Sequence, residues 1–315
     1  MSDHPIPTDR ARALVTGAYD THIHVGPDVM KRRIDDVSLA RRFAEVGMAG
    51  FVLKSHYVPT AERAEVVRGV IPGVDVLGAL TLNGSVGGLN PVAVEIAGRQ
   101  GARIVWFPTV DSVNQRESRA LAPAGSTPPM WAELQDDLAR EGIMSPAIRI
   151  LDGSGAILPE VGDVLTVIAK HDMVLATGHL SSREIVVVVD AAIDAGVNRV
   201  IVTHPEFTSQ QLSVDVQQRL AERGALMERC FTTPHSGKVS WEVVFDHIRQ
   251  VGPEHSILSS DLGQPFNPPV EDGLALMADQ LLAAGFSDDE INIMAVVNTR
   301  GAAAPTATSQ AVGAA

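Results

Sequence analysis

The stretch YDTHIHVGPD (residues 19–28) decides the fold assignment, because it is typical of a β-strand that runs into a turn. Side chains alternate between the two faces of a strand, so His22 and His24 lie on one face at the strand end. Two imidazoles placed in this way can hold a metal ion. One such pair is a weak signal, but single histidines recur further along the chain at the ends of other apolar runs.

The composition is that of a globular enzyme, with 315 residues, of which 45% are hydrophobic and 20% charged. A formal net charge of −13 argues against binding to nucleic acid, which needs clustered lysines and arginines. Cys230 is the single cysteine, so an intrachain disulfide and a cysteine-rich zinc site are both excluded. Any metal ligands must therefore come from histidine, carboxylates or a modified lysine.

Neither a leader segment nor a membrane-spanning segment is expected from the sequence. The first residues lack a basic start followed by an apolar stretch, and no apolar run is long enough to cross a bilayer. We therefore expect a cytoplasmic protein. We also expect a small-molecule substrate and a homo-oligomer. Neither nucleic acid nor a membrane is expected as a partner.

Short apolar runs alternate with segments of helical period, which is the pattern of β/α units around a parallel sheet. The eight expected strands lie near 18–25, 50–56, 75–82, 102–109, 173–179, 199–204, 225–230 and 256–261. The expected helices lie near 36–47, 59–69, 90–99, 130–141, 159–170, 182–195, 209–223, 240–251, 270–284 and 287–299.

Eight such units predict an α/β fold, specifically a (β/α)8 TIM barrel that forms a single domain over residues 1–301. Residues 302–315 have no period and are expected to be a disordered tail. The longest departure from the alternation is 111–157, in which residues 147–151 are expected to form an added strand.

The chemistry of a β/α barrel lies at the carboxyl ends of its strands, where this sequence places histidines, a lysine and an aspartate. The candidates at these ends are His22, His24, Lys54, His56, His179, His204 and Asp261. Each has an ordinary structural alternative, since a lone histidine is often only hydrogen-bonded and Asp261 can cap a turn. Because all strand ends meet at one end of the barrel, these side chains are expected to lie close together, which predicts a metal site.

Three further residues are candidates for binding substrate or supporting the site. Arg32 lies on the loop after the first histidine pair and can attract an anionic substrate, or it can pair with nearby aspartates. His235 follows strand seven and can touch substrate. Glu228 and Arg229 alternate in strand seven, so only one can point inward; if Glu228 does, it can orient a ligand histidine.

The order of these residues resembles the pattern of the amidohydrolase superfamily of metal-dependent hydrolases. His22 and His24 match the His-x-His after strand one, and His179, His204 and Asp261 match the ligands after strands five, six and eight. The resemblance implies a divalent metal, most simply zinc, and one or two ions. It also implies that Asp261 acts as general base and acid, and His56 as a donor to the oxyanion or an orienting group.

One feature departs from the family pattern, because strand four carries no lysine and its nearest carboxylate, Asp111, lies in the turn beyond. Lys54 can replace that ligand as a carbamate that bridges two metals, or it can remain an ammonium. The resemblance implies hydrolysis of an amide or cyclic amide C–N bond. The alternatives are a lactonase or phosphoesterase, a metal-dependent decarboxylase or hydratase, and a barrel that binds without turnover.

Overall fold

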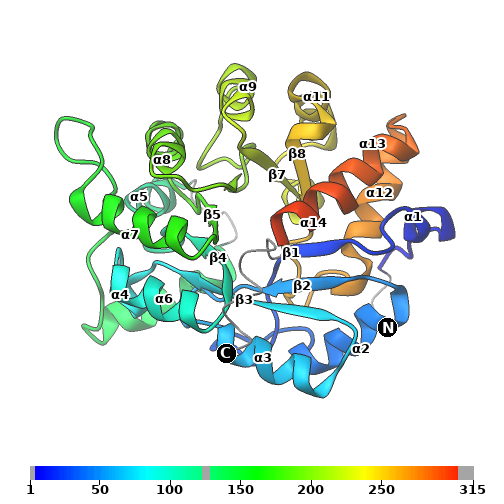
Figure 1. Cartoon of the computed structure of the whole chain (residues 1–315), viewed down its shortest axis with the longest axis horizontal. Helices are drawn as coiled ribbons and strands as arrows, with labels where there is room; N and C mark the ends of the chain where they lie inside the picture. The colour runs from blue at the N-terminus through cyan, green and yellow to red at the C-terminus, as the bar shows by residue number, and fades with distance from the viewer. Residues whose placement is uncertain (1–3, 123–127, 304–315) are drawn as a thin grey trace.

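The computed structural model describes residues 4–122 and 128–303. Within these ranges, eight parallel strands form one sheet in which each strand pairs with its neighbour in sequence. The strands are β1 (Tyr19–Ile23), β2 (Gly50–Leu53), β3 (Asp75–Thr81), β4 (Ala102–Trp106), β5 (Val174–Ala176), β6 (Val200–Val202), β7 (Leu226–Cys230) and β8 (Ser256–Ser259). Figure 1 shows the strands in the middle of the molecule with helices around them. The predicted (β/α)8 barrel is confirmed.

The sheet closes into a barrel where the segment after β8 runs beside β1. The amide of Asp261 donates to the carbonyl oxygen of His22 at 2.8 Å, and the amide of His24 donates to that of Leu262 at 2.8 Å. A side chain at Gly263 would collide with the carbonyl oxygen of His24, and its φ of 133° disfavours any other residue. This backbone closure brings the end of β1 next to residue 261.

The helices cover the outside of the barrel, and most lie close to their predicted positions. They are α1 (Asp9–Leu14), α2 (Asp36–Val46), α3 (Ala61–Val70), α4 (Pro91–Arg99), α5 (Val113–Ala120), α6 (Met130–Arg140), α7 (Pro159–Lys170), α8 (Ser182–Asp194), α9 (Val214–Glu222), α10 (Thr232–His235), α11 (Trp241–Val251), α12 (Gly273–Ala283), α13 (Asp288–Asn292) and α14 (Asn298–Ala303). Single 3₁₀ turns cover Gly84–Val86, Pro253–His255 and Val270–Asp272, and a π-helical turn covers Ile293–Val297.

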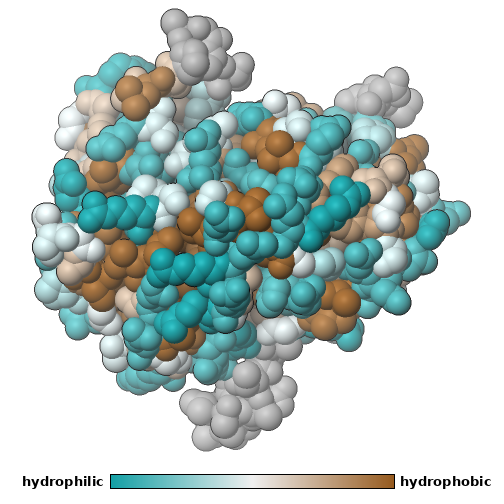
Figure 2. All heavy atoms as spheres, turned by 90° about the horizontal axis from the view of Figure 1, so that it is seen from above, coloured by the Kyte–Doolittle hydropathy of each residue, from teal (hydrophilic) through white to brown (hydrophobic). Residues whose placement is uncertain are grey.

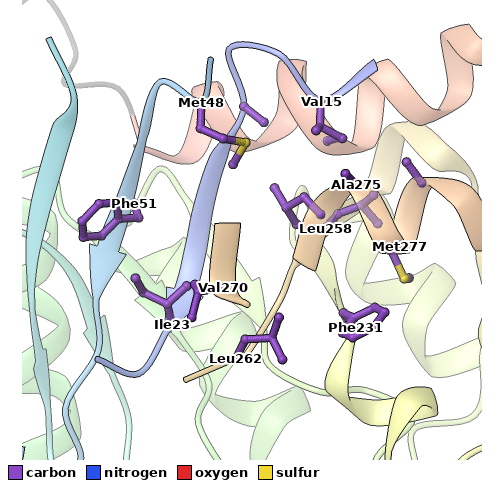
Figure 3. Packing of buried hydrophobic residues seen from close by; sticks show 14 of the residues in the cluster. Val15, Ile23, Met48, Phe51, Phe231, Leu258, Leu262, Val270, Ala275 and Met277 are labelled. Atoms are coloured by element: carbon purple, nitrogen blue, oxygen red, sulfur yellow. The ribbon is translucent and has the colours of Figure 1, made fainter. Parts of the chain in front are cut away.

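Both faces of the sheet are buried, one by side chains inside the barrel and the other by the helices. Figure 3 shows part of the outer layer, where Phe51 of β2 and Leu258 of β8 belong to the same cluster as Ala275 of α12. Trp106 and Ile257 belong to a separate cluster inside the barrel. Because both faces are covered, the strands are almost continuously apolar, and polar chemistry is concentrated near their ends.

The molecular surface alternates between hydrophobic and hydrophilic groups. On the face seen in Figure 2, hydrophobic residues gather in several groups that are separated by hydrophilic ones. No helix in the described ranges is long and apolar enough to cross a membrane.

Two expectations about the chain organisation need correction. Residues 147–151 do not form an added strand; Ile148 makes only an isolated bridge to Ser112, and Leu151 an isolated bridge to Ile157. The expected tail also begins too early, since α14 includes Ala302 and Ala303, which are buried. Small apolar side chains allow this last turn to pack on the barrel. Residues 304–315 lie outside the described residues.

Candidate metal centre

The predicted site residues come together at the carboxyl ends of the strands. His22 lies in β1 and Glu228 in β7, while the others follow their strands by one to three residues: His24, Lys54, His56, His179, His204 and Asp261. His22, His24, Lys54, His56 and His204 are buried, whereas the side chains of His179 and Asp261 are partly exposed. The topology therefore assembles in one place residues that are up to 239 positions apart, from His22 to Asp261.

The carboxylate of Asp261 is the centre of this group. Its Oδ1 atom lies 3.2 Å from Nε2 of both His22 and His24, and its Oδ2 atom lies 3.9 Å from Nε2 of His204. The hydroxyl of Thr232 donates to Oδ2 at 2.9 Å. His204 and Asp261 also share left-handed backbone, with φ of 49° and 52°, a conformation that is uncommon outside glycine and often found at functional sites.

Lys54 reaches the same point from β2. Its Nζ atom lies 2.7 Å from Nε2 of His22 and 5.1 Å from the ring centroid of Trp106. Trp106 is the last residue of β4, the strand on which the superfamily pattern places a lysine, and its ring lies 5.6 Å from that of His22. Strand four lacks the lysine of the superfamily pattern. In the structure, Trp106 of that strand fills the space beneath Lys54. Asp111 is turned away and pairs with Arg116 at 2.7 Å.

A second layer of the site holds the imidazoles in place. Nδ1 of His22 lies 3.1 Å from Oε1 of Glu228, which also accepts from the hydroxyl of Ser259 at 3.0 Å. Glu228 is therefore the inward-facing member of its pair, and it fixes the orientation of the His22 ring. Cys230 is buried, and its Sγ atom lies 3.1 Å from Oγ of Ser259 and 3.9 Å from Nδ1 of His22.

The protonation states of four of the histidines and of the carboxylate suit metal binding. For His22, burial and Lys54 oppose the charged form, but Glu228 and Asp261 outweigh them and raise the pKa of its ring. Burial lowers the pKa of His24, His56 and His179 well below the usual value, and that of His204 to about 4, so these rings are neutral at pH 7. Burial opposes ionisation of Asp261, but His22 and His24 hold the pKa of its carboxyl well below its usual range. Neutral imidazoles and an ionised carboxylate are the forms in which these groups bind metals.

The spacing of the donor atoms also fits a metal ion. Candidate ligand atoms of His22, His24 and Asp261 all lie within 4.8 Å of one another. Two ligands at about 2.0–2.1 Å from a tetrahedral ion are about 3.4 Å apart, close to the 3.2 Å contacts of Asp261. The Nε2 atoms of His22 and His24, together with the carboxylate of Asp261, form a donor set of the kind that a divalent metal accepts.

The three residues predicted to contact substrate have different positions. Arg32 lines the cavity above the site, and it pairs with a nearby aspartate, Asp28, at 2.7 Å. Glu228 does not line the cavity and lies behind His22. His235 is exposed and stacks on Phe231 at 4.7 Å, and it is not among the described residues that line the cavity. The short helix α10 holds its ring against Phe231, outside the cavity lining, and its contact with substrate stays a prediction.

Three supporting residues were missed in the sequence. Asp20 is buried in β1; its Oδ1 accepts from the amide of Ser260 at 3.0 Å, and burial raises its pKa to about 7. It ties β1 to the segment that carries Asp261. Asn83 and Thr109 hold His56 from the loops after β3 and β4. Asp20 could have been found from the sequence, because it lies two residues before His22 in the same strand and so shares its face. No local sequence pattern marks Asn83 or Thr109.

A cavity of about 900 Å³ opens above the site. Its floor includes His24, Lys54, His56 and Asp261, and its walls include aromatic side chains such as Trp131. This volume is sufficient for a small organic molecule. A ligand in the cavity would therefore have direct access to the imidazoles and the carboxylate.

Solved structures with the same fold include several described as hydrolases. An amidohydrolase from Pseudomonas aeruginosa superposes with a TM-score of 0.56 at 10% identity, covering 96% of this chain and 100% of its own. The probable dipeptidase PvdM from the same organism gives 0.58 at 10% identity, covering 93% and 96%. The phosphotriesterase homology protein from Escherichia coli gives 0.54 at 12% identity, covering 90% and 97%.

These likenesses show that the chain shares with these proteins the (β/α)8 barrel fold that the sequence predicts. Residues 17–228 match a family described as a family of unknown function, DUF6282, and the chain belongs to that family. None of the curated proteins compared with the chain is a significant match.

Proposed function

We propose that this protein is a metal-dependent hydrolase that cleaves the C–N bond of a small amide or cyclic amide. The observation that carries the proposal is the meeting of His24, His204 and Asp261 at the floor of an open cavity, with the buried His22 in contact with the same carboxylate. The described functions of two proteins with the same fold, an amidohydrolase and a probable dipeptidase, support C–N cleavage.

Zinc is the ion we propose, because imidazole and carboxylate donors at this spacing suit its tetrahedral geometry. A bound ion would polarise the scissile carbonyl and lower the pKa of a bound water to about 7. The residues that would hold it are His22, His24, His204 and Asp261, with His179 at the cavity side.

Asp261 is the residue we assign to proton transfer. Its carboxylate is ionised, lines the cavity and is held by Thr232, so one oxygen is fixed while the group still faces substrate. In this position it would take the proton of the attacking water and deliver it to the leaving nitrogen.

His56 is assigned as a neutral hydrogen-bond donor to the developing oxyanion. Asn83 Nδ2 donates to the Thr109 hydroxyl oxygen at 2.7 Å, which favours donation of the hydroxyl hydrogen to Nδ1 of His56 at 2.9 Å. The proton of the His56 ring would then reside on Nε2. Since His56 lines the cavity, this N–H can face the substrate carbonyl.

Lys54 determines how many ions the site would hold. Burial lowers the pKa of its amine, which increases the neutral form that can add to carbon dioxide. In that reaction a nitrogen–carbon bond forms and the amine loses a proton, leaving a carbamate with two oxygens. A carbamate would bridge two ions beside His22, whereas an ammonium would leave a site for one.

The function is tested by assaying the zinc-loaded protein against N-acyl amino acids, cyclic amides, lactones and phosphoesters. We expect turnover of an amide or cyclic amide, at least about 100-fold loss after chelation, and recovery when zinc is restored. Turnover of lactones or phosphoesters alone would contradict C–N specificity. Release of carbon dioxide or addition of water without cleavage would place the protein among decarboxylases or hydratases.

A further inference from the structure

The cavity above the metal centre is cationic, although the chain as a whole carries a formal charge of −13. Four basic side chains line it: Arg32, Lys54, Arg119 and Lys238. Among the described residues that line the cavity, Asp261 is the one carboxylate. A concave surface with more basic side chains than carboxylates attracts an anion.

Three of these four basic side chains already have partners in the described chain. Lys54 contacts His22 at 2.7 Å, Arg32 pairs with Asp28 at 2.7 Å, and Arg119 pairs with Asp136 at 2.6 Å.

Lys238 differs from the other three. Its side chain is exposed, and it forms no ion pair with any residue in the described ranges. Its ammonium lies 5.1 Å from the ring centroid of Phe207. Lys238 is therefore the cation of the cavity whose charge the described chain leaves available.

Phe207 connects Lys238 to the metal centre. Its ring centroid lies 5.7 Å from that of His204, so the Lys238 ammonium and the His204 ring are at most about 11 Å apart. A ligand made of one ring and a short acid side chain fits within this upper limit. Two further aromatic side chains, Trp131 and Phe266, line the same cavity, and Phe266 is 68% exposed. An exposed aromatic side chain at the edge of a cavity is a common mark of ligand binding.

We propose that Lys238 binds a carboxylate at the far end of the substrate, whose apolar, ring-sized body lies against Phe207, Trp131 and Phe266. The inference rests on the proposed function, because it places the bond to be cleaved at the metal centre. A carboxylate is favoured over a phosphate because a single ammonium supplies a compact charge with three donors. Phosphate recognition commonly adds an arginine fork or several backbone amides.

The proposal is tested by calorimetric titration of the metal-loaded protein with 3-phenylpropanoate and its neutral analogue 4-phenylbutan-2-one, which has no bond that a hydrolase of this kind cleaves. We expect the carboxylate to bind at least about fivefold more tightly than the ketone. The Lys238→Met variant should lose this preference with ketone affinity unchanged, and Lys238→Arg should largely retain it. Lys170→Met is the matched control, since it removes the same charge from a lysine of α7 that does not line the cavity.

Equal affinity of the two ligands, or a preference that survives in Lys238→Met, would overturn the proposal, because the carboxylate would then bind elsewhere, such as at the metal. Tighter binding of phenyl phosphate than of the carboxylate would overturn the assigned anion. Because the titration measures binding and requires no turnover, its result can be interpreted even if the proposed hydrolysis is not found. With an identified anionic substrate, Lys238→Met should raise KM and leave kcat within about twofold.

Discussion

Asp261→Asn is expected to reduce kcat/KM by about a thousandfold or more on any substrate that the assays identify. The amide keeps the size of the side chain but cannot accept the proton of the attacking water, and general base catalysis alone contributes about 10²–10⁴-fold. The loss of a negative ligand beside His22 and His24 adds to the effect. Steady-state kinetics with matched zinc content in both proteins measures it.

The matched control for this variant is Asp194→Asn, which changes the same group on the outer helix α8, where the side chain is 77% exposed. We expect its kinetics to equal those of the unchanged protein. A tenfold or smaller loss in Asp261→Asn would refute the role of Asp261 as the base. Circular dichroism spectra of both variants should match that of the parent, since Asp261 contributes to the site rather than to the core.

Glu206→Gln is expected to lower the free energy of unfolding by about 3–5 kcal/mol. Glu206 pairs with Arg229 behind the barrel, where the two side chains are 2% and 0% exposed. Burial already lowers the pKa of Arg229 to about 9, and its NH1 atom also donates to Gln217 at 2.8 Å. Removing the carboxylate leaves a buried guanidinium without its counter-charge. Urea unfolding followed by fluorescence measures the loss.

Two further variants serve as controls for this stability experiment. Arg10→Met removes an exposed pair with Asp288, whose side chains are 66% and 52% exposed, and we expect no measurable change. The double variant Glu206→Gln with Arg229→Met removes both charges and should recover part of the loss. A change below about 1 kcal/mol in Glu206→Gln would show that the pair is not a major source of stability.

The sequence was sufficient to predict the barrel and the residues at its strand ends. His22, His179, His204 and Asp261 each follow an apolar run, and in a β/α barrel all such ends meet on one side. Local pattern and topology together therefore determine where these residues lie. Their roles as ligands and base are proposals that the geometry supports.

The rest of the site depends on tertiary contacts that no local pattern records. Trp106 resembles any core aromatic until the structure places it beneath Lys54. His235 lies in a single helical turn, α10, which sets the direction of its ring. The strand expected over residues 147–151 does not form, and Ile148 makes an isolated bridge to Ser112. Both positions lie in connecting segments, where packing rather than periodicity sets the conformation.

The most direct test of the central claim is calorimetric titration of the metal-free protein with zinc, combined with metal analysis of the recovered complex. We expect tight binding of one zinc ion per chain if Lys54 is an ammonium, or of two if it is a carbamate. Binding should be abolished in a His22→Ala, His204→Ala double variant that still unfolds cooperatively. Failure of the folded parent protein to bind zinc, manganese or cobalt, or unchanged binding in that double variant, would contradict the metal centre.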